Sequence, residues 1–151
     1  MSGAALGRSP QIVVIDASMA LAWLFERQQP QDIEQANRLL SACGDYPWWV
    51  PSLWHLEVAN ALLVAERRSL LPQAESDCFL ARLSSLPILT DTDPLPARRQ
   101  RILALARDQG LSSYDATYLE LAQRLGATLA SFDRQLNQAA SANAVTLFSQ
   151  L

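Results

Sequence analysis

Four carboxylate side chains stand at positions that a parallel β-sheet would bring together. Asp16 directly follows a short apolar run of β-branched residues, and Asp133 comes just after another short apolar run. Glu57 and Asp115 lie in segments whose patterns predict helices. Because the carboxyl ends of parallel strands share one edge of a sheet, we expect the topology to bring all four acids to that edge.

Glu57 gives the strongest indication of what such a cluster would bind. It lies in an apolar stretch of its helix, with Asn60 three residues further on and therefore on the same face. A carboxylate in this setting is costly unless a cation pairs with it, and four clustered carboxylates do not all stay ionised without one. Oxygen ligands of this kind suit Mg²⁺ or Mn²⁺, and one or two such ions activate a water for in-line attack on a phosphodiester.

Each acid taken singly also has a purely structural interpretation. Asp16 and Asp133 each precede a predicted helix and are suited to cap it. Asp115 lies three residues after Ser112, which is the spacing of a capping box, and Glu57 fits a solvated helix position. The joint arrangement favours a functional cluster over four unrelated structural roles.

The pattern of the chain predicts one α/β domain at residues 12–151, preceded by an N-terminal extension at residues 1–11. Short apolar runs alternate with helical periodicity, which indicates a three-layer α/β/α domain with a central, mostly parallel sheet of four to five strands. The expected strands are residues 12–15, 48–50, 87–89, 127–130 and, as a fifth, 144–148. The expected helices are residues 18–26, 31–42, 52–68, 72–83, 96–109, 112–125 and 134–140.

The composition excludes several kinds of chemistry. The chain has 151 residues, 50% of them hydrophobic, and a formal net charge of −3. All 12 basic residues are arginine, so a phosphate-binding loop or a Schiff base that depends on lysine is excluded. With two cysteines and a single histidine, a zinc site built from these residue types is excluded as well. No apolar run approaches the roughly 20 residues of a membrane-spanning helix, so we expect a cytoplasmic protein.

Four segments together carry a family resemblance. They are residues 14–18, 57–62, 111–122 and 129–136, and each contains one of the four acids. In this order and spacing they resemble the successive motifs of PIN-domain ribonucleases, in particular the VapC-type toxins of bacterial type II toxin–antitoxin pairs. The stretch Ser-Tyr-Asp-Ala-Thr-Tyr at residues 113–118 is the most specific, and the resemblance extends from about residue 12 to the C-terminus.

The resemblance implies a metal-dependent endoribonuclease with a PIN-like fold. Its catalytic residues and its ligands of Mg²⁺ or Mn²⁺ would be Asp16, Glu57, Asp115 and Asp133, and the positions that support these carboxylates in the family are matched by Ser18, Asn60 and Ser131. The resemblance also implies an RNA substrate, a homodimer and inhibition by a cognate antitoxin protein. The N-terminal extension departs from the family, whose first strand usually begins near the initiator methionine.

Arginines are the remaining candidates for contacts to the RNA backbone, because the chain has no lysine. Arg134 is the first candidate for RNA binding, since it directly follows Asp133 and arginine grips phosphate with two donors. For the cluster of Arg98, Arg99 and Arg101, a solvated helix face is the favoured interpretation.

Two other functions fit parts of the sequence. One is a catalytically inactive PIN-fold binding module, against which the presence of all four acids counts. The other is a haloacid-dehalogenase-like phosphatase, because Asp91 and Asp93 form an Asp-x-Asp pair after a short apolar run. That phosphatase chemistry also needs a lysine to hold the phosphoryl group, and this chain has none.

Overall fold

The computed structural model describes residues 11–151, and a four-stranded parallel sheet lies at its centre. The strands are β1 (Val13–Ile15), β2 (Trp48–Val50), β3 (Ile88–Thr90) and β4 (Thr128–Ala130), in the spatial order β3-β2-β1-β4. Every residue of β1 and of β4 is buried, as expected of apolar strands that are covered on both faces. The outer strand β3 is partly exposed.

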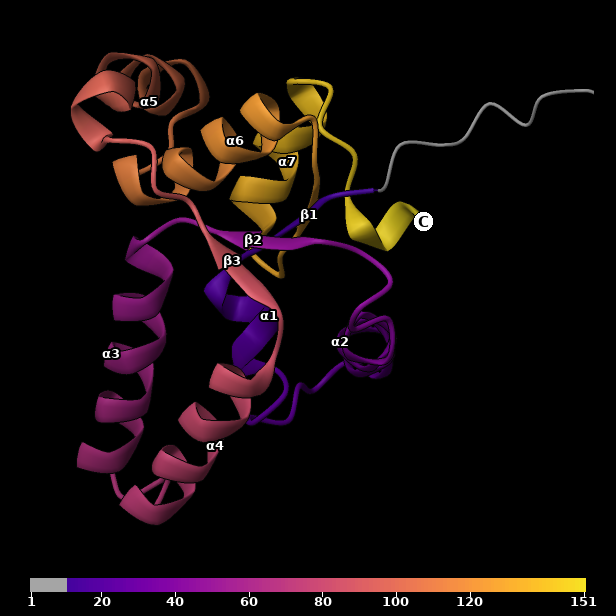
Figure 1. The fold of residues 1–151 in the computed structure, drawn as a ribbon, viewed down its shortest axis with the longest axis vertical. Coiled ribbons are helices and arrows are strands. Elements are labelled where there is room, and N and C mark those ends of the chain that lie inside the picture. Colours follow the sequence, from indigo (N-terminus) through magenta and orange to yellow (C-terminus); the bar gives the residue numbers. More distant parts are fainter. Residues whose placement is uncertain (1–10) are drawn as a thin grey trace, which may run out of the picture.

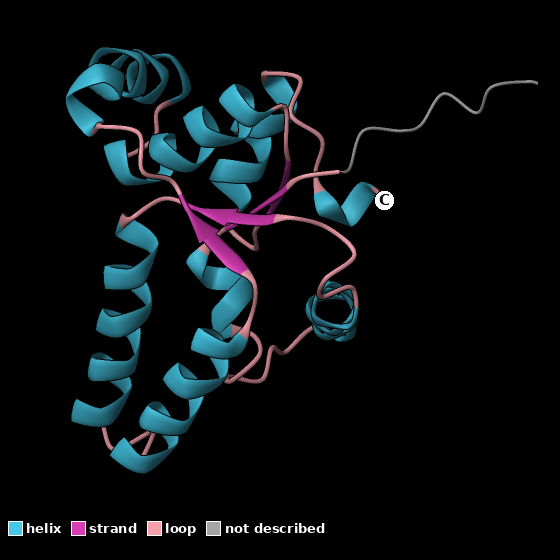
Figure 2. Cartoon of the chain, viewed as in Figure 1, coloured by secondary structure: helices cyan, strands magenta, loops and turns pink. Residues whose placement is uncertain are grey.

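Helices cover both faces of the sheet and so form three layers (Figure 1 and Figure 2). One face carries α1 (Ala17–Leu21), α2 (Pro30–Ser41), α3 (Leu53–Arg67) and α4 (Gln73–Ser85), and the other carries α5 (Leu95–Gln109), α6 (Ser113–Leu125) and α7 (Arg134–Ala142). The strands β1, β2 and β3 step across the sheet in one direction, so their right-handed crossovers share a face. The return from β3 to β4 places α5 and α6 on the opposite face, which confirms the predicted α/β/α arrangement.

The pairing of β1 with β4 sets the edge of the sheet at which the acids gather. Ile15 lies opposite Ala130 in the register, and the backbone N–H of Asp16 donates to the carbonyl of Ala130 at 3.0 Å. Asp16 and Ser131 therefore leave the sheet side by side. The connections after the two strands then diverge, α1 to one face and α7 to the other (Figure 1). Residues of both connections, among them Ser18 and Phe132, line an open crevice.

Local signals in the sequence fix where α5 and α6 begin and end. Gly110 and Gly126 follow these helices with left-handed φ angles of +64° and +60°, which glycine adopts without a steric penalty. Ser112 caps α6, since its Oγ accepts a hydrogen bond from the backbone N–H of Asp115 at 3.1 Å. These boundaries agree with the predicted helices at residues 96–109 and 112–125 to within one residue.

The predicted fifth strand at residues 144–148 is wrong. Leu147 forms only an isolated bridge to Leu129, and the chain continues as a 3₁₀ helix, η1 (Phe148–Gln150). The N–H of Val145 is already used, because it donates to the carbonyl of Ala140 at 2.9 Å and closes the end of α7. The N–H of Leu147 is also used outside the sheet, because it donates to Oε1 of Gln150 at 3.0 Å. The segment therefore joins β4 through a single backbone hydrogen bond, from the N–H of Leu129 to the carbonyl of Thr146 at 2.9 Å.

Two other expectations concern the beginning of the chain. The helix predicted at residues 18–26 ends at Leu21, and turns follow it. The proposed N-terminal extension falls, except for Gln11, outside the residues that the structure describes. No helix within residues 11–151 is both long enough and apolar enough to cross a membrane.

Candidate active site

Asp16 is the most deeply buried of the four acids, with 6% of the residue exposed. Its Oδ2 accepts two hydrogen bonds at 2.7 Å, one from the hydroxyl of Ser18 and one from the hydroxyl of Ser131. Burial raises the pKa of Asp16, the two serine hydroxyls oppose this, and the nearby charge of Asp133 raises the pKa further. The Asp16 carboxylate is therefore held in one orientation, but burial and the charge of Asp133 destabilise its ionised form.

The same two serines join the loop after β1 to the loop after β4. The Ser18 hydroxyl accepts a hydrogen bond from the N–H of Phe132 at 3.0 Å, and the Ser131 hydroxyl accepts one from the N–H of Asp133 at 3.0 Å. Each hydroxyl thus accepts from the backbone and donates to Asp16, so both of its roles are satisfied. The positions of Asp16 and Asp133 are coupled through these two side chains.

Glu57 reaches the crevice from α3 and is held by a tyrosine on α6. The hydroxyl of Tyr118 donates to Oε1 of Glu57 at 2.6 Å, and Tyr118 is fully buried. Burial raises the pKa of Glu57, this hydrogen bond opposes the increase, and the charges of Asp16 and Asp115 add to it. Sequence reasoning assigned no role to Tyr118. The available signal was its spacing of three residues from Asp115, which puts both on one face of α6.

Asp115 and Asp133 lie at the N-terminal ends of α6 and α7 and also border the crevice. Asp115 contributes only its backbone N–H to the cap of α6, and burial together with the charges of Asp133 and Asp16 raises the pKa of its carboxyl group. Asp133 caps α7, because its Oδ1 accepts a hydrogen bond from the N–H of Leu136 at 2.8 Å. The capping interpretation of Asp133 is therefore confirmed, and it does not remove this acid from the cluster.

All four acids line one open cavity of about 460 Å³ at the carboxyl ends of β1 and β4. The residues around it are Asp16, Ala17, Ser18, Leu21, Arg27, Glu57, Ala61, Asp115, Phe132 and Asp133. Ser131 contacts this site through Asp16 without lining the cavity. Asn60 and Arg134 are exposed and do not line it, so the structure does not bring these two predicted residues to the acids.

The donor set suits a divalent cation chemically. Its members are hard oxygen ligands, and the charges of these acids raise the pKa values of one another, which is a repulsion that a bound cation relieves. In their present positions, however, no three His, Cys, Asp or Glu side chains within residues 11–151 lie close enough together to hold a metal ion. Metal binding would therefore require some of the carboxylates to turn inward.

Comparison with known proteins identifies the fold family. Residues 13–142 match the sequence model of the family described as PIN domain. This chain belongs to the PIN-domain family. The protein named Ribonuclease VapC3, from Pyrobaculum aerophilum, is 33% identical over 124 residues, which cover 82% of this chain and 91% of that protein. The resemblance drawn from the four sequence motifs is thus confirmed.

Solved structures agree with this assignment at the level of the fold. The crystal structure of PAE2754 from Pyrobaculum aerophilum has a TM-score of 0.64 and 24% identity, and the alignment covers 87% of each chain. The crystal structure of VapBC2 from Rickettsia felis, bound to a DNA fragment from their promoter, has a TM-score of 0.60 and 14% identity, covering 91% of this chain and 97% of that one.

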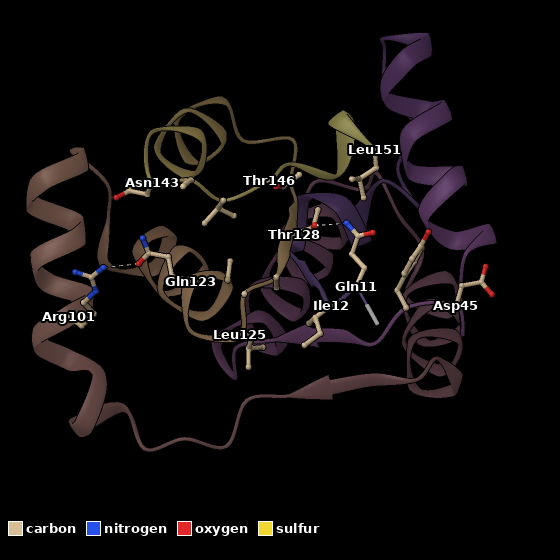
Figure 3. Close-up of a pocket in the computed structure, with 16 residues that line it drawn as sticks. Gln11, Ile12, Asp45, Arg101, Gln123, Leu125, Thr128, Asn143, Thr146 and Leu151 are labelled. Atoms are coloured by element: carbon tan, nitrogen blue, oxygen red, sulfur yellow. Dashed lines mark hydrogen bonds between the residues drawn. The ribbon is translucent and has the colours of Figure 1, made fainter. Parts of the chain in front are cut away.

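A larger cavity of about 1070 Å³ lies at the other end of the strands of this PIN domain (Figure 3). It is bordered by Ile12 before β1 and by Thr128 at the start of β4, and Asp45 is the one acidic side chain among its lining residues. A hydrogen bond from Arg101 to Gln123 at 2.9 Å crosses its wall. This cavity lacks the clustered acids, so its size does not make it the better candidate for metal-dependent chemistry.

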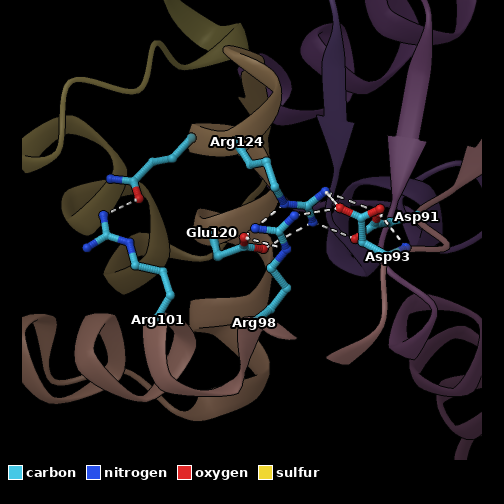
Figure 4. Close-up of polar contacts among 7 residues, drawn as sticks. Asp91, Asp93, Arg98, Arg101, Glu120 and Arg124 are labelled. Atoms are coloured by element: carbon cyan, nitrogen blue, oxygen red, sulfur yellow. Dashed lines mark hydrogen bonds and ion pairs between the residues drawn. The ribbon is translucent and has the colours of Figure 1, made fainter. Parts of the chain in front are cut away.

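The Asp-x-Asp pair of the phosphatase hypothesis is engaged in ion pairs (Figure 4). The guanidinium of Arg124 lies 2.6 Å from Asp91, 3.0 Å from Asp93 and 2.9 Å from Glu120. Arg98 adds a contact of 2.7 Å to Asp93, and this hydrogen bond is the main reason that the pKa of Asp93 is lowered. Arg98 is thus occupied within the PIN domain rather than free on a solvated face.

Proposed function

We propose that this PIN-domain protein is a metal-dependent endoribonuclease, the toxin of a VapC-type toxin–antitoxin pair. The supporting observation is the cavity in which Asp16, Glu57, Asp115 and Asp133 meet at the carboxyl ends of β1 and β4. The relative with 33% identity carries the name of a ribonuclease, which supports RNA as the substrate. A cytoplasmic location remains the prediction of the sequence.

The four acids are the proposed ligands of Mg²⁺ or Mn²⁺. When bound, such an ion supplies an activated water and stabilises the charge that develops on the phosphodiester. Ser18 and Ser131 keep the Asp16 carboxylate oriented, and Tyr118 does the same for Glu57. Preorganised carboxylates lose little conformational freedom when the ion and the substrate arrive. These side-chain contacts are therefore part of the proposed machinery rather than only part of the core.

Metal dependence is tested directly by titration. We expect the purified protein to cleave a set of structured RNAs in the presence of Mg²⁺ or Mn²⁺, to stop after chelation with EDTA, and to recover when the metal is restored. Calorimetry with Mn²⁺ should detect binding to the wild type and at least roughly tenfold weaker binding to Asp115→Asn. Cleavage that persists in EDTA would contradict the proposal, and RNA binding without any cleavage would favour the inactive binding module.

Partners of two kinds belong to this proposal. A cognate antitoxin is supported by the likeness in fold to VapBC2. A homodimer is compatible with Leu56 and Leu63, which are 75% and 40% exposed and stand seven residues apart, about two turns, along α3. Light scattering should give twice the mass of one chain. Expression of this chain in a bacterium should arrest growth, and coexpression of a cognate antitoxin should relieve the arrest.

Tyr118→Phe is expected to move the pH dependence of cleavage. The substitution removes the hydrogen bond that favours ionised Glu57, so the pKa of Glu57 rises further above its usual value. Because metal binding needs the ionised carboxylate, the acidic limb of the rate profile should shift to higher pH, with the smallest loss of activity at alkaline pH. Rates measured across the pH range test this. Tyr114→Phe, an exposed tyrosine on the same helix, is the control and should leave the profile unchanged.

A further inference from the structure

Arg27 is the one basic side chain among the residues that line the acidic cavity. It also borders an adjoining open cavity of about 350 Å³ that is formed by Glu26, Gln28, Gln29 and Asp32. Arg27 thus stands between the acids and a second hollow on the surface. Its side chain is 36% exposed and so remains accessible to a ligand.

The guanidinium of Arg27 is held in place from two sides. Its central carbon lies 4.3 Å from the centroid of the Phe132 ring, a cation–π contact with the residue just before Asp133. Its Nε and Nη2 donate to Oδ2 of Asp32 at 3.3 and 3.0 Å. Its ion pair is therefore with Asp32, at the start of α2, and with none of the four site acids. Nη1 donates no hydrogen bond within residues 11–151 and is available to a ligand.

A substrate with a phosphate backbone needs a cation at this point. Four carboxylates repel an approaching RNA strand, and the net charge of −3 offers no general attraction to offset this. Three other candidate arginines are less suitable, because none of Arg98, Arg124 and Arg134 lines the cavity. A planar guanidinium that is already oriented by stacking binds phosphate oxygens with little further loss of entropy.

We propose that Arg27 binds a backbone phosphate of the RNA beside the cleaved bond and so positions the strand over the acids. This inference rests on the proposed ribonuclease function. Phe132 and Asp32 orient the guanidinium for this contact. No local pattern in the sequence indicates this role, because Arg27 lies in the connection between α1 and α2, outside the four motif segments.

The test is RNA affinity measured without cleavage. In an Asp16→Asn background, fluorescence anisotropy with a labelled single-stranded RNA should give about 5- to 20-fold weaker binding for Arg27→Gln, the loss of one charged phosphate contact. The slope of log affinity against log salt should fall by about 0.7, the value for one phosphate contact on a single strand. Arg107→Gln, an exposed arginine on α5, is the charge-matched control and should change neither quantity by more than about twofold.

Two further variants separate phosphate binding from a structural role. If the only role of Arg27 were its ion pair with Asp32, Arg27→Gln and Asp32→Asn would weaken RNA binding equally. We expect instead that Asp32→Asn retains most of the RNA affinity. In the cleaving protein, Arg27→Gln should raise KM with kcat within about threefold of the wild type. The inference is overturned if Arg27→Gln behaves like Arg107→Gln, or if Arg134→Gln alone weakens binding. Absence of cleavage by the wild type with metal present would instead defeat the proposed function.

Discussion

Asp16→Asn is expected to lower RNA cleavage roughly 10³-fold while the protein stays folded. The amide retains the shape of the carboxylate and still accepts from Ser18 and Ser131, so the contacts that fix this position survive. It lacks the negative charge that a divalent cation requires. Cleavage assays with Mg²⁺ or Mn²⁺ measure the loss, and Asp108→Asn, an exposed acid on α5, is the matched control. Activity in Asp16→Asn close to that of the wild type would remove Asp16 from the proposed machinery.

The same variant carries a prediction about stability in the absence of metal. The pKa of Asp16 is raised in the folded protein, chiefly by burial, so folding favours the protonated carboxyl group. The protonated Asp16 side chain therefore stabilises the fold in full at pH values below the pKa that Asp16 has in the unfolded chain. This stabilisation is lost as the pH rises through the higher pKa that Asp16 has in the folded protein. Asn is neutral throughout. Asp16→Asn should therefore match the wild type in Tm near pH 4 and exceed it near pH 7.5, as thermal unfolding in EDTA would measure. An equal or lower Tm at neutral pH would contradict this account.

Arg124→Gln is expected to reduce the free energy of unfolding by about 2–3 kcal/mol. Arg124 contacts three acids, of which the side chains of Glu120 and Asp91 are 6% and 17% exposed. The substitution leaves Asp91 without its cation and leaves Glu120 with only the more distant Nε of Arg98, at 3.9 Å. The network joins the loop after β3 to α6 (Figure 4). Urea unfolding measures the effect, and Arg107→Gln should stay within about 0.5 kcal/mol of the wild type.

A second substitution checks whether unpaired charge is the cause. In Arg124→Gln, the further change Glu120→Gln removes one of the stranded carboxylates and should recover part of the lost stability. A double-mutant cycle isolates this coupling from changes in packing. If the changes in unfolding free energy caused by the two substitutions simply add, the ion pair between Arg124 and Glu120 contributes little to stability, as is usual for exposed pairs.

The elements that local patterns specify were predicted well. The β-branched run before Asp16 is buried on both faces as β1, and Gly110 and Gly126 end their helices where the sequence indicates. These features depend on contacts between near neighbours in the chain. The segment at 144–148 has the same apolar character but was predicted wrongly, because Val145 donates its N–H to the end of α7 and Leu147 donates its N–H to Gln150.

The sequence by itself determined that an acid follows β1 and another follows β4, and with parallel strands this places both at one edge. Only the tertiary structure decided which side chains complete the site. Tyr118 reaches Glu57 across 61 positions of sequence, and Arg27 reaches Phe132 across the crevice, whereas Asn60 and Arg134 point elsewhere. The physical reason is that these contacts depend on how α1, α3 and α6 pack around the sheet. No periodicity or spacing within one segment records that packing.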